Sequence, residues 1–414
     1  MDGVGHMDEI VNKVIKGEIK FYRVEEHVGN DVNIASEIRR KVLEKMRDIS
    51  LENIGKYSMD MNLTAKRNIE NSIGCAQIPI GIAGPLKVTG DYTDEEVYIP
   101  LATTEGTLVA STNRGCTAIT RSGGAKSKII RDGITRAPAL KVPDVNHAYK
   151  LISWVRENHQ EIVKVFDGTD PFLNLINIEP WIVGRTVFLR FRANTYDAMG
   201  MNTVTRGARF ACDFITQEQP YAKLISESGN MCVDKKPSAI NWILGRGKTA
   251  ISEVTLKKEV VKDVLKTTPE SIAELAYRKL FLGGAQALSL GFNAHVANII
   301  AAIFLATGQD AAHVTDSSMS IITPEVTEDG DLYIAVTIPS LETGTFGGGT
   351  GLPTQSEALA IIGCQGPGDP PGAMGKRFAE IVAAAALAGD ISLLSAQSAL
   401  HLTGAHERLG RGHV

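Results

Sequence analysis

Two long apolar stretches, residues 280–308 and 378–402, most constrain the fold that this chain can adopt. Each is long enough to cross a membrane, but each carries polar side chains that are costly to place in lipid. These side chains are Gln286, Asn293, His295 and Asn298 in the first stretch and Glu380, Asp390 and Gln397 in the second. We therefore expect two buried helices at the centre of a large core, and no membrane partner.

Charge balance and cysteine content narrow the possible function classes. The 43 basic and 47 acidic residues give a formal net charge of −4, whereas a protein dedicated to nucleic acid usually carries a basic surface. The five cysteines are odd in number and none stands in a CxxC motif, which argues against a disulfide framework or a zinc site. The acidic N-terminus lacks the pattern of a signal peptide. We expect a cytoplasmic protein with no metal and no nucleic-acid partner.

Residues 137–227 have the order β-α-β-β-α-β, which is that of a ferredoxin-like unit. The expected strands are 137–142, 172–181, 186–193 and 222–226, with helices over 145–165 and from about 198. This unit begins and ends inside a helix-rich sequence, so we predict an inserted small domain. The fold class is then α+β, with an N-terminal helical segment at 1–60, a large domain at 61–136 and 228–414, and the small domain at 137–227.

The flanking sequence predicts fewer strands than helices. We expect amphipathic helices over 7–16 and 34–49, a turn-rich segment at 78–85, a strand at 96–101 and a helix over 107–120. Beyond 228 the pattern favours helices, with one strand pair at 319–322 and 332–338 and a glycine loop at 344–351.

Two short motifs place a charged side chain where chemistry is possible. Glu105 lies in Thr-Thr-Glu-Gly at an expected strand-to-helix junction, where a partly buried carboxyl can act as an acid or simply cap the helix. Lys235 follows a Ser-Gly-Asn turn and precedes Pro237 by two residues. Such a rigid ammonium can stabilise an oxyanion, although adjacent lysines usually form a solvated patch.

Asp310 and His406 are further candidates. Asp310 ends an apolar helix, where the helix dipole disfavours an anion, so it should have a cationic partner in either a structural ion pair or a reactive site. His406 lies near the chain end among glycines, which suits either a frayed terminus or a mobile flap that delivers the histidine. His295 and Asn298 share the apolar helix and read as core residues or as site lining.

Dinucleotide-binding signals are present but do not match the common fingerprints. Residues 197–202 follow a strand and open a helix, whose free amides can receive a phosphate. The glycine loop 344–351 would let main chain approach a pyrophosphate. Neither a GxGxxG Rossmann motif nor a Walker A lysine motif is present.

Nine strings occur in a fixed order along the chain. They are ENSIG (70–74), PIGIAGPL (79–86), TTEG (103–106), STNRGC (111–116), DAMGMN (197–202), DKKPSAINW (234–242), NAH (293–295), GQD (308–310) and GTFGGGT (344–350). Together they closely resemble the class I, biosynthetic 3-hydroxy-3-methylglutaryl-CoA (HMG-CoA) reductases. The resemblance runs from about residue 22 to 411. The chain is similar to the soluble archaeal form, without the membrane anchor of animal members.

The resemblance implies an NADPH-dependent, four-electron reduction of HMG-CoA to mevalonate and free CoA, the first committed step toward isoprenoids. Lys235 matches the lysine that stabilises the first oxyanion, and His406 matches the acid that protonates the thiolate. Glu105 matches the acid of the aldehyde step, and Asp310 matches the aspartate that links lysine and glutamate. Such a group titrates as a coupled system.

The resemblance also implies binding residues and an oligomer. The HMG group would contact Arg136, Ser228, Asp234, Lys236, Lys279, His295 and Asn298. CoA would contact Tyr22, Ser111, Asn113, Arg114 and Lys266. NADPH would contact Asp197, Met199, Gly200, Met201, Asn202, Gly347, Gly348 and Gly349. The ENSIG string resembles a dimer contact, so we expect a homodimer or dimer of dimers in which Lys235 and Glu105 of one site come from different chains.

Three departures and two alternatives accompany this interpretation. Thr117 stands where animal members have arginine, Gly412 stands where they carry a regulatory serine, and residues 155–172 match poorly, so the contact to the 2′-phosphate is not assigned. One alternative is the NADH-using, degradative class II reductase. The other is a CoA-binding regulatory protein without catalysis. The presence of all four catalytic residues argues against this second alternative.

Overall fold

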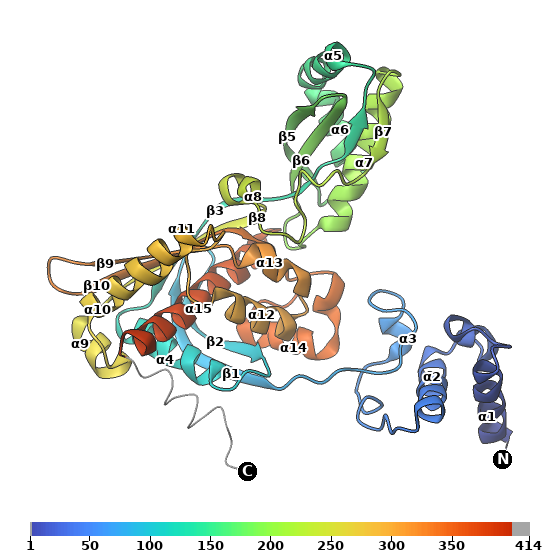
Figure 1. The fold of residues 1–414 in the computed structure, drawn as a ribbon, viewed down its shortest axis with the longest axis horizontal. Helices are drawn as coiled ribbons and strands as arrows, with labels where there is room; N and C mark the ends of the chain where they lie inside the picture. The colour runs from blue at the N-terminus through green and yellow to red at the C-terminus, as the bar shows by residue number, and fades with distance from the viewer. Residues whose placement is uncertain (1, 400–414) are drawn as a thin grey trace.

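The computed structural model describes residues 2–399 and contains three groups of elements, each with its own apolar core (Figure 1). Helices and strands are mixed throughout, which confirms the α+β class. The three cores lie in the N-terminal helices, in the unit at the top of Figure 1 and in the large unit at its centre. They support the domain division that we propose from the sequence.

A single long strand joins the small unit to the large one. The first part of β3 (Ala125–Arg136) pairs with β8 (Gly247–Leu256), from Lys126 opposite Glu253 to Gly133 opposite Gly247. Its last three residues pair instead with β6 (Thr186–Asn194). The two units are therefore connected through continuous backbone hydrogen bonding, and the end of β3 lies at their junction.

The small unit has the strand order β7-β4-β6-β5, antiparallel throughout, as expected for a ferredoxin-like arrangement. Its elements are β4 (Ala139–Lys141), α5 (Val145–Glu157), α6 (His159–Asp167), β5 (Asn174–Val183), β6, α7 (Met201–Glu218) and β7 (Lys223–Ser226). The one long helix expected over 145–165 is two helices, because the chain leaves the helical conformation at Asn158.

The large unit is built around α15 (Ala373–Ser398), which is almost entirely buried. Among the described residues it is the one helix long and apolar enough to cross a membrane, and 94% of its most apolar window lies inside the protein. The apolar stretch at 280–308 differs from our prediction of one helix. It forms a π-helix, η3 (Tyr277–Gly283), the short α11 (Gly284–Gln286), a non-helical segment and then α12 (Val296–Thr307).

Three strands of the large unit were not predicted. They are β3, β8 and β1 (Ile80–Thr89), the last of which lies where we expected only turns. Strand β1 pairs with β2 (Asp94–Ala102), which corresponds to the strand predicted at 96–101. The predicted strand pair is present as β9 (Ile321–Val326) and β10 (Leu332–Leu341). The other elements here are α4 (Leu108–Arg121), α8 (Ala239–Leu244), α9 (Lys258–Val260), η2 (Val261–Leu265), α10 (Pro269–Ala276), η4 (Ala311–His313), α13 (Val314–Ser317), η5 (Gly348–Gly351) and α14 (Pro353–Ile362).

The N-terminal unit contains α1 (Asp2–Ile15), η1 (Phe21–His27), α2 (Val32–Arg47) and α3 (Met61–Thr64). Asp31 begins α2 by accepting hydrogen bonds from the amides of Asn33 and Ile34. An extended segment then leads to β1 of the large unit (Figure 1). This unit packs mainly on itself. The other two units form the cavity that is described in the next section.

Candidate active site

A cavity of about 590 Å³ lies where the small and large units meet. Its wall is formed by residues 198–203 at the start of α7, residues 308–310 after α12, and the glycine loop at 344 and 346–350. Arg136 from the end of β3 and the adjacent Asp234 and Lys235 complete it. Residues that are more than 200 positions apart in the sequence, Arg136 and the glycine loop, thus share one cavity.

An ion pair between Lys235 and Asp310 lies in this wall, with Nζ 2.7 Å from Oδ2. The hydrogen bond to Asp310 raises the pKa of Lys235 above its ordinary value, against the effect of burial. Burial alone would raise the pKa of Asp310, but the hydrogen bonds from Lys235 and from the Ala312 amide outweigh it and lower that pKa. Both groups are therefore charged at neutral pH.

The backbone explains why this pair is held in place. Lys235 adopts a left-handed conformation with φ of 59°, which is strained for a residue with a side chain. Our prediction that Asp310 ends the apolar helix was wrong. Asp310 is instead the N-cap of the following 3-10 helix, η4. A carboxylate is favourable at that position, and the cationic partner that we expected is Lys235.

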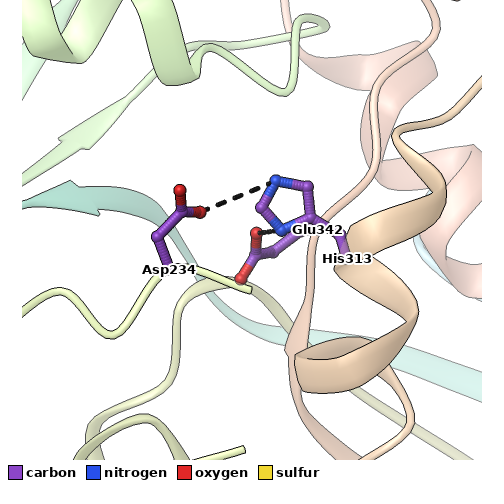
Figure 2. A group of neighbouring side chains, drawn as sticks. All are labelled: Asp234, His313 and Glu342. Atoms are coloured by element: carbon purple, nitrogen blue, oxygen red, sulfur yellow. Dashed lines mark ion pairs between the residues drawn. The ribbon is translucent and has the colours of Figure 1, made fainter. Parts of the chain in front are cut away.

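A charged network lies behind this pair; the sequence analysis predicted Asp234 and missed its other members, Arg246, His313, Asp316 and Glu342. The fully buried Arg246 guanidinium contacts Asp234 Oδ1 at 2.9 Å, Asp316 Oδ2 at 3.2 Å and Glu342 Oε2 at 2.5 Å. Figure 2 shows the His313 ring between Asp234 and Glu342, whose carboxylates face opposite ring nitrogens. In the sequence, Arg246 stands between two glycines and His313 between two apolar residues, and neither setting is distinctive enough to identify a site.

Four predicted HMG contacts lie in or beside the cavity wall: Arg136 and Asp234 line it, and Ser228 and Lys236 are next to these two. Arg136 donates to Ser228 Oγ at 3.1 Å and to Thr205 Oγ1 at 2.8 Å. Lys236 is exposed and donates to the Asp234 carbonyl at 3.0 Å. The structure thus brings Arg136, Ser228, Asp234 and Lys236 to the Lys235 side of the molecule.

A second group of predicted residues lies on the large unit around α12 and α15. The amides of Ala294 and His295 donate to Asp390 at 2.7 and 2.9 Å, and His295 Nε2 lies 2.9 Å from the Gly389 carbonyl oxygen. Asn298 Nδ2 lies 3.4 Å from His295 Nδ1. The charge of Lys279 also acts on Asp390. We predicted that His295 lies within the apolar helix, but it precedes α12 as the N-cap.

Glu105 differs from our expectation of a partly buried acid. It lies between β2 and α4 and is exposed, and its amide donates to Thr103 Oγ1 at 3.0 Å. In the part of the chain that the structure describes, no hydrogen bond or ion pair joins Glu105 to Lys235 or Asp310. His406, the fourth predicted catalytic residue, lies outside the described residues.

The predicted CoA contacts lie mostly along α4, which packs on α15. Ser111 and Arg114 bond with Ser392, at 2.9 Å between the hydroxyls and 3.0 Å from Arg114 Nε, and Asn113 accepts from the Gly84 amide at 2.9 Å. The remaining two predicted contacts are Lys266, after η2, and the exposed Tyr22 in η1 of the N-terminal unit. None of these five side chains lines the Lys235 cavity.

Asp197 does not line the cavity, although the predicted cofactor residues around it do. Its carboxylate accepts three backbone amides, from Gly368 at 3.0 Å, Gly372 at 2.7 Å and Gly375 at 2.8 Å. It is buried and so ties the loop before α7 to the start of α15. The other predicted residues, Met199, Gly200, Met201, Asn202 and Gly347 to Gly349, all lie in the cavity wall.

Comparisons with known proteins agree on one family. Residues 35–411 match the family model described as hydroxymethylglutaryl-coenzyme A reductase. The 3-hydroxy-3-methylglutaryl-coenzyme A reductase of Pyrococcus horikoshii is 53% identical over 407 residues, 98% of each chain. The reductase of the same name from Methanocaldococcus jannaschii is 50% identical over 409 residues, covering 98% of this chain and 99% of the other.

A solved structure shares the fold at lower sequence identity. The class II 3-hydroxy-3-methylglutaryl-CoA reductase from Streptococcus pneumoniae, bound to NADPH in open conformations, matches with a TM-score of 0.63 and 17% identity. The match covers 87% of this chain and 96% of that chain. At this identity the likeness supports the architecture alone.

We expect Asp197→Ala to lower the free energy of unfolding by at least about 2 kcal/mol, because three buried amides would lose a charged acceptor. Asp213→Ala is the matched control, since Asp213 lies on α7 in an exposed pair with Arg209 and should cost about 0.5 kcal/mol or less. Urea denaturation measures both. Equal stability of the two variants, with cofactor affinity lost only in Asp197→Ala, would make Asp197 a direct ligand.

Proposed function

This chain belongs to the hydroxymethylglutaryl-coenzyme A reductase family, and we propose that the Lys235 cavity is where it reduces the thioester of HMG-CoA to mevalonate. The Lys235–Asp310 ion pair, 2.7 Å long in the wall of that cavity, is the observation that carries this assignment. An ammonium that stays charged at neutral pH and faces a cavity suits a reaction in which negative charge develops on a carbonyl oxygen.

The overall reaction converts a thioester, two hydrides and two protons into an alcohol and a thiol. Four residues each have one role in it. Lys235 stabilises the oxyanion of the first reduction, and Asp310 fixes Lys235. His406 gives a proton to the departing thiolate of CoA. Glu105 gives a proton to the aldehyde oxygen in the second reduction. One proton goes to a sulfur atom and the other to an oxygen atom at a different place. This explains why the family pattern has both a histidine and a glutamate.

NADPH would supply one hydride in each of the two reductions. The cavity fits a dinucleotide because Gly347 and Gly348 both have left-handed φ values, and a Cβ added to either would meet nothing within 4 Å. Main chain there is open to a ligand. Beside this loop, Gly200 is the N-cap of α7 and provides no side-chain cap, so the first amides of α7 are available to a phosphate.

We propose the class I, biosynthetic assignment rather than class II. The match of residues 197–202 and of Tyr22 to the class I pattern supports it. A preference for NADH over NADPH would contradict the class I assignment, whereas a preference for NADPH does not by itself decide it, because the class II structure described above is bound to NADPH. We also propose a cytoplasmic location, which the five unpaired cysteines support.

We further propose a homodimer or dimer of dimers with shared active sites. Lys235 and Asp310 lie at one cavity, whereas Glu105, His295 and Asn298 lie on other elements with no described bond to that pair. A partner chain could bring its Glu105 group to this cavity by two-fold symmetry. Assembly would then exclude water from the charged pocket.

The wild-type protein should oxidise NADPH when HMG-CoA is added and release free thiol, measured by absorbance and by a thiol reagent. Lys235→Ala should lower turnover by at least about 10²- to 10³-fold, because the oxyanion loses its cation, while HMG-CoA still binds. Lys223→Ala, an exposed lysine on β7, is the control and should keep full activity. Near-normal turnover of Lys235→Ala would remove that residue from the mechanism, and a protein that binds CoA without turnover would support the regulatory alternative.

Complementation tests the shared site. Glu105→Gln and Lys235→Ala homodimers should each be nearly inactive. After mixing and subunit exchange, each heterodimer would hold one site with both defects and one intact site, so activity should return toward half of normal per heterodimer. If a tag demonstrates exchange and no activity returns, both residues act within one chain.

A further inference from the structure

His313 is a buried, charged group for which the proposed reaction has no role so far. Its side chain is 1% exposed and lies directly behind the Lys235–Asp310 pair. Nε2 is 3.7 Å from Asp310 Oδ2 and 3.8 Å from Asp234 Oδ1, while Nδ1 contacts Glu342 and lies 3.6 Å from Asp316 Oδ1. The ring therefore lies between the two carboxylates nearest the cavity and two that are fully buried.

Charged groups face His313 from every element around it. Asp310 and Asp316 come from its own turn, Asp234 from the loop after β7, Glu342 from the end of β10 and Arg246 from the residue before β8. Lys235 is one step further, through Asp310. Four carboxylates thus face two cations besides His313, so a neutral imidazole would leave the group with an excess negative charge.

The same side chains have the spacing of a metal site, since ligand atoms of Asp234, His313 and Glu342 all lie within 4.8 Å of one another. Arg246, however, already donates to Glu342 and pairs with Asp234. A divalent cation would have to displace this buried guanidinium, which has no other carboxylate partner than Asp316 among the described residues. The charges favour a protonated histidine over a metal ion.

We propose that His313, as an imidazolium, is a positioning residue for the reduction proposed above: it holds Asp310 and Asp234 against the buried Glu342 and Asp316, so that Lys235 is fixed toward the cavity. The inference rests on the proposed function for its link to turnover. Its structural part, a charged histidine inside the network, stands separately and can be measured separately.

The ionisation of the network supports this role. Burial alone would lower the pKa of His313, but hydrogen bonds to Asp316 and Glu342 outweigh it and raise that pKa to about 9. Burial raises the pKa of Glu342 to about 7 despite Arg246 and His313. The two groups titrate as a pair, and both are charged between these values. Lys235 loses its proton only at higher pH, because its pKa is raised above 10.5.

The experiment compares the pH profile of kcat for the wild type, His313→Gln, His313→Asn and Glu342→Gln. Glutamine keeps a polar group toward Asp310, and asparagine keeps one toward Glu342, but neither carries a charge. His147→Gln is the matched control, because His147 is a half-exposed histidine that bonds Asp144 on the small unit. Circular dichroism checks the fold of each variant.

We expect an alkaline limb near pH 9 in the wild type and in His147→Gln. In His313→Gln and His313→Asn that limb should be absent and kcat at pH 8 should fall on the order of 10- to 100-fold, with KM for HMG-CoA nearly unchanged, because Lys235 is misplaced without being removed. Glu342→Gln should move the limb toward lower pH by one unit or more. A wild-type profile without this limb, or a His313→Gln profile that keeps it, would overturn the proposal.

A stability measurement separates this inference from the proposed function. Because the folded pKa of His313 lies above its ordinary value of about 6.5, its stabilising contribution is fully present below pH 6.5 and is lost as pH rises through about 9. The urea midpoint of His147→Gln should show this fall, and that of His313→Gln should lack it. Inactivity of the wild type on HMG-CoA would refute the function alone, and identical midpoint profiles for the two variants would refute the charged histidine.

Discussion

The buried Arg246 guanidinium is the interaction on which the site depends. It contacts carboxylates from the loop after β7, from α13 and from the end of β10, and it also donates to Met201 Sδ at the start of α7. Removing such charges from water is costly unless each is paired. The four segments must therefore come together for any of them to be stable, and this assembly is what places Asp234 and Lys235 at the cavity.

Continuity of the sheet and closeness of the glycine backbone complete the junction. Strand β3 passes from one unit into the other and ends at Arg136. Within the cavity wall, a Cβ at Gly308 would lie 2.2 Å from the Gly349 carbonyl oxygen, and one at Gly344 would lie 2.5 Å from the Met199 amide nitrogen. The loops thus pack backbone to backbone, which only glycine permits. The cavity keeps its shape because its walls have no side chains at these contacts.

Much of the fold, and part of the site, could be predicted from local patterns. Strand β6 was predictable because Val187, Leu189 and Phe191 alternate and are all buried. Strand β8 was not, because its buried Ser252 bonds the buried Ser127 of β3, so polar residues occupy core positions. Arg246 and His313 escaped prediction for a related reason: their burial depends on distant carboxylates that no local pattern reveals.

A double-mutant cycle on the free energy of unfolding tests most directly whether Arg246 organises the site. Arg246→Met alone should cost about 3–5 kcal/mol, because it leaves buried carboxylates without a partner. Combining it with Glu342→Gln should cost less than the sum of the two single changes by about 1 kcal/mol or more. Costs that add to within about 0.5 kcal/mol would contradict the account and show that the two charges are stabilised independently.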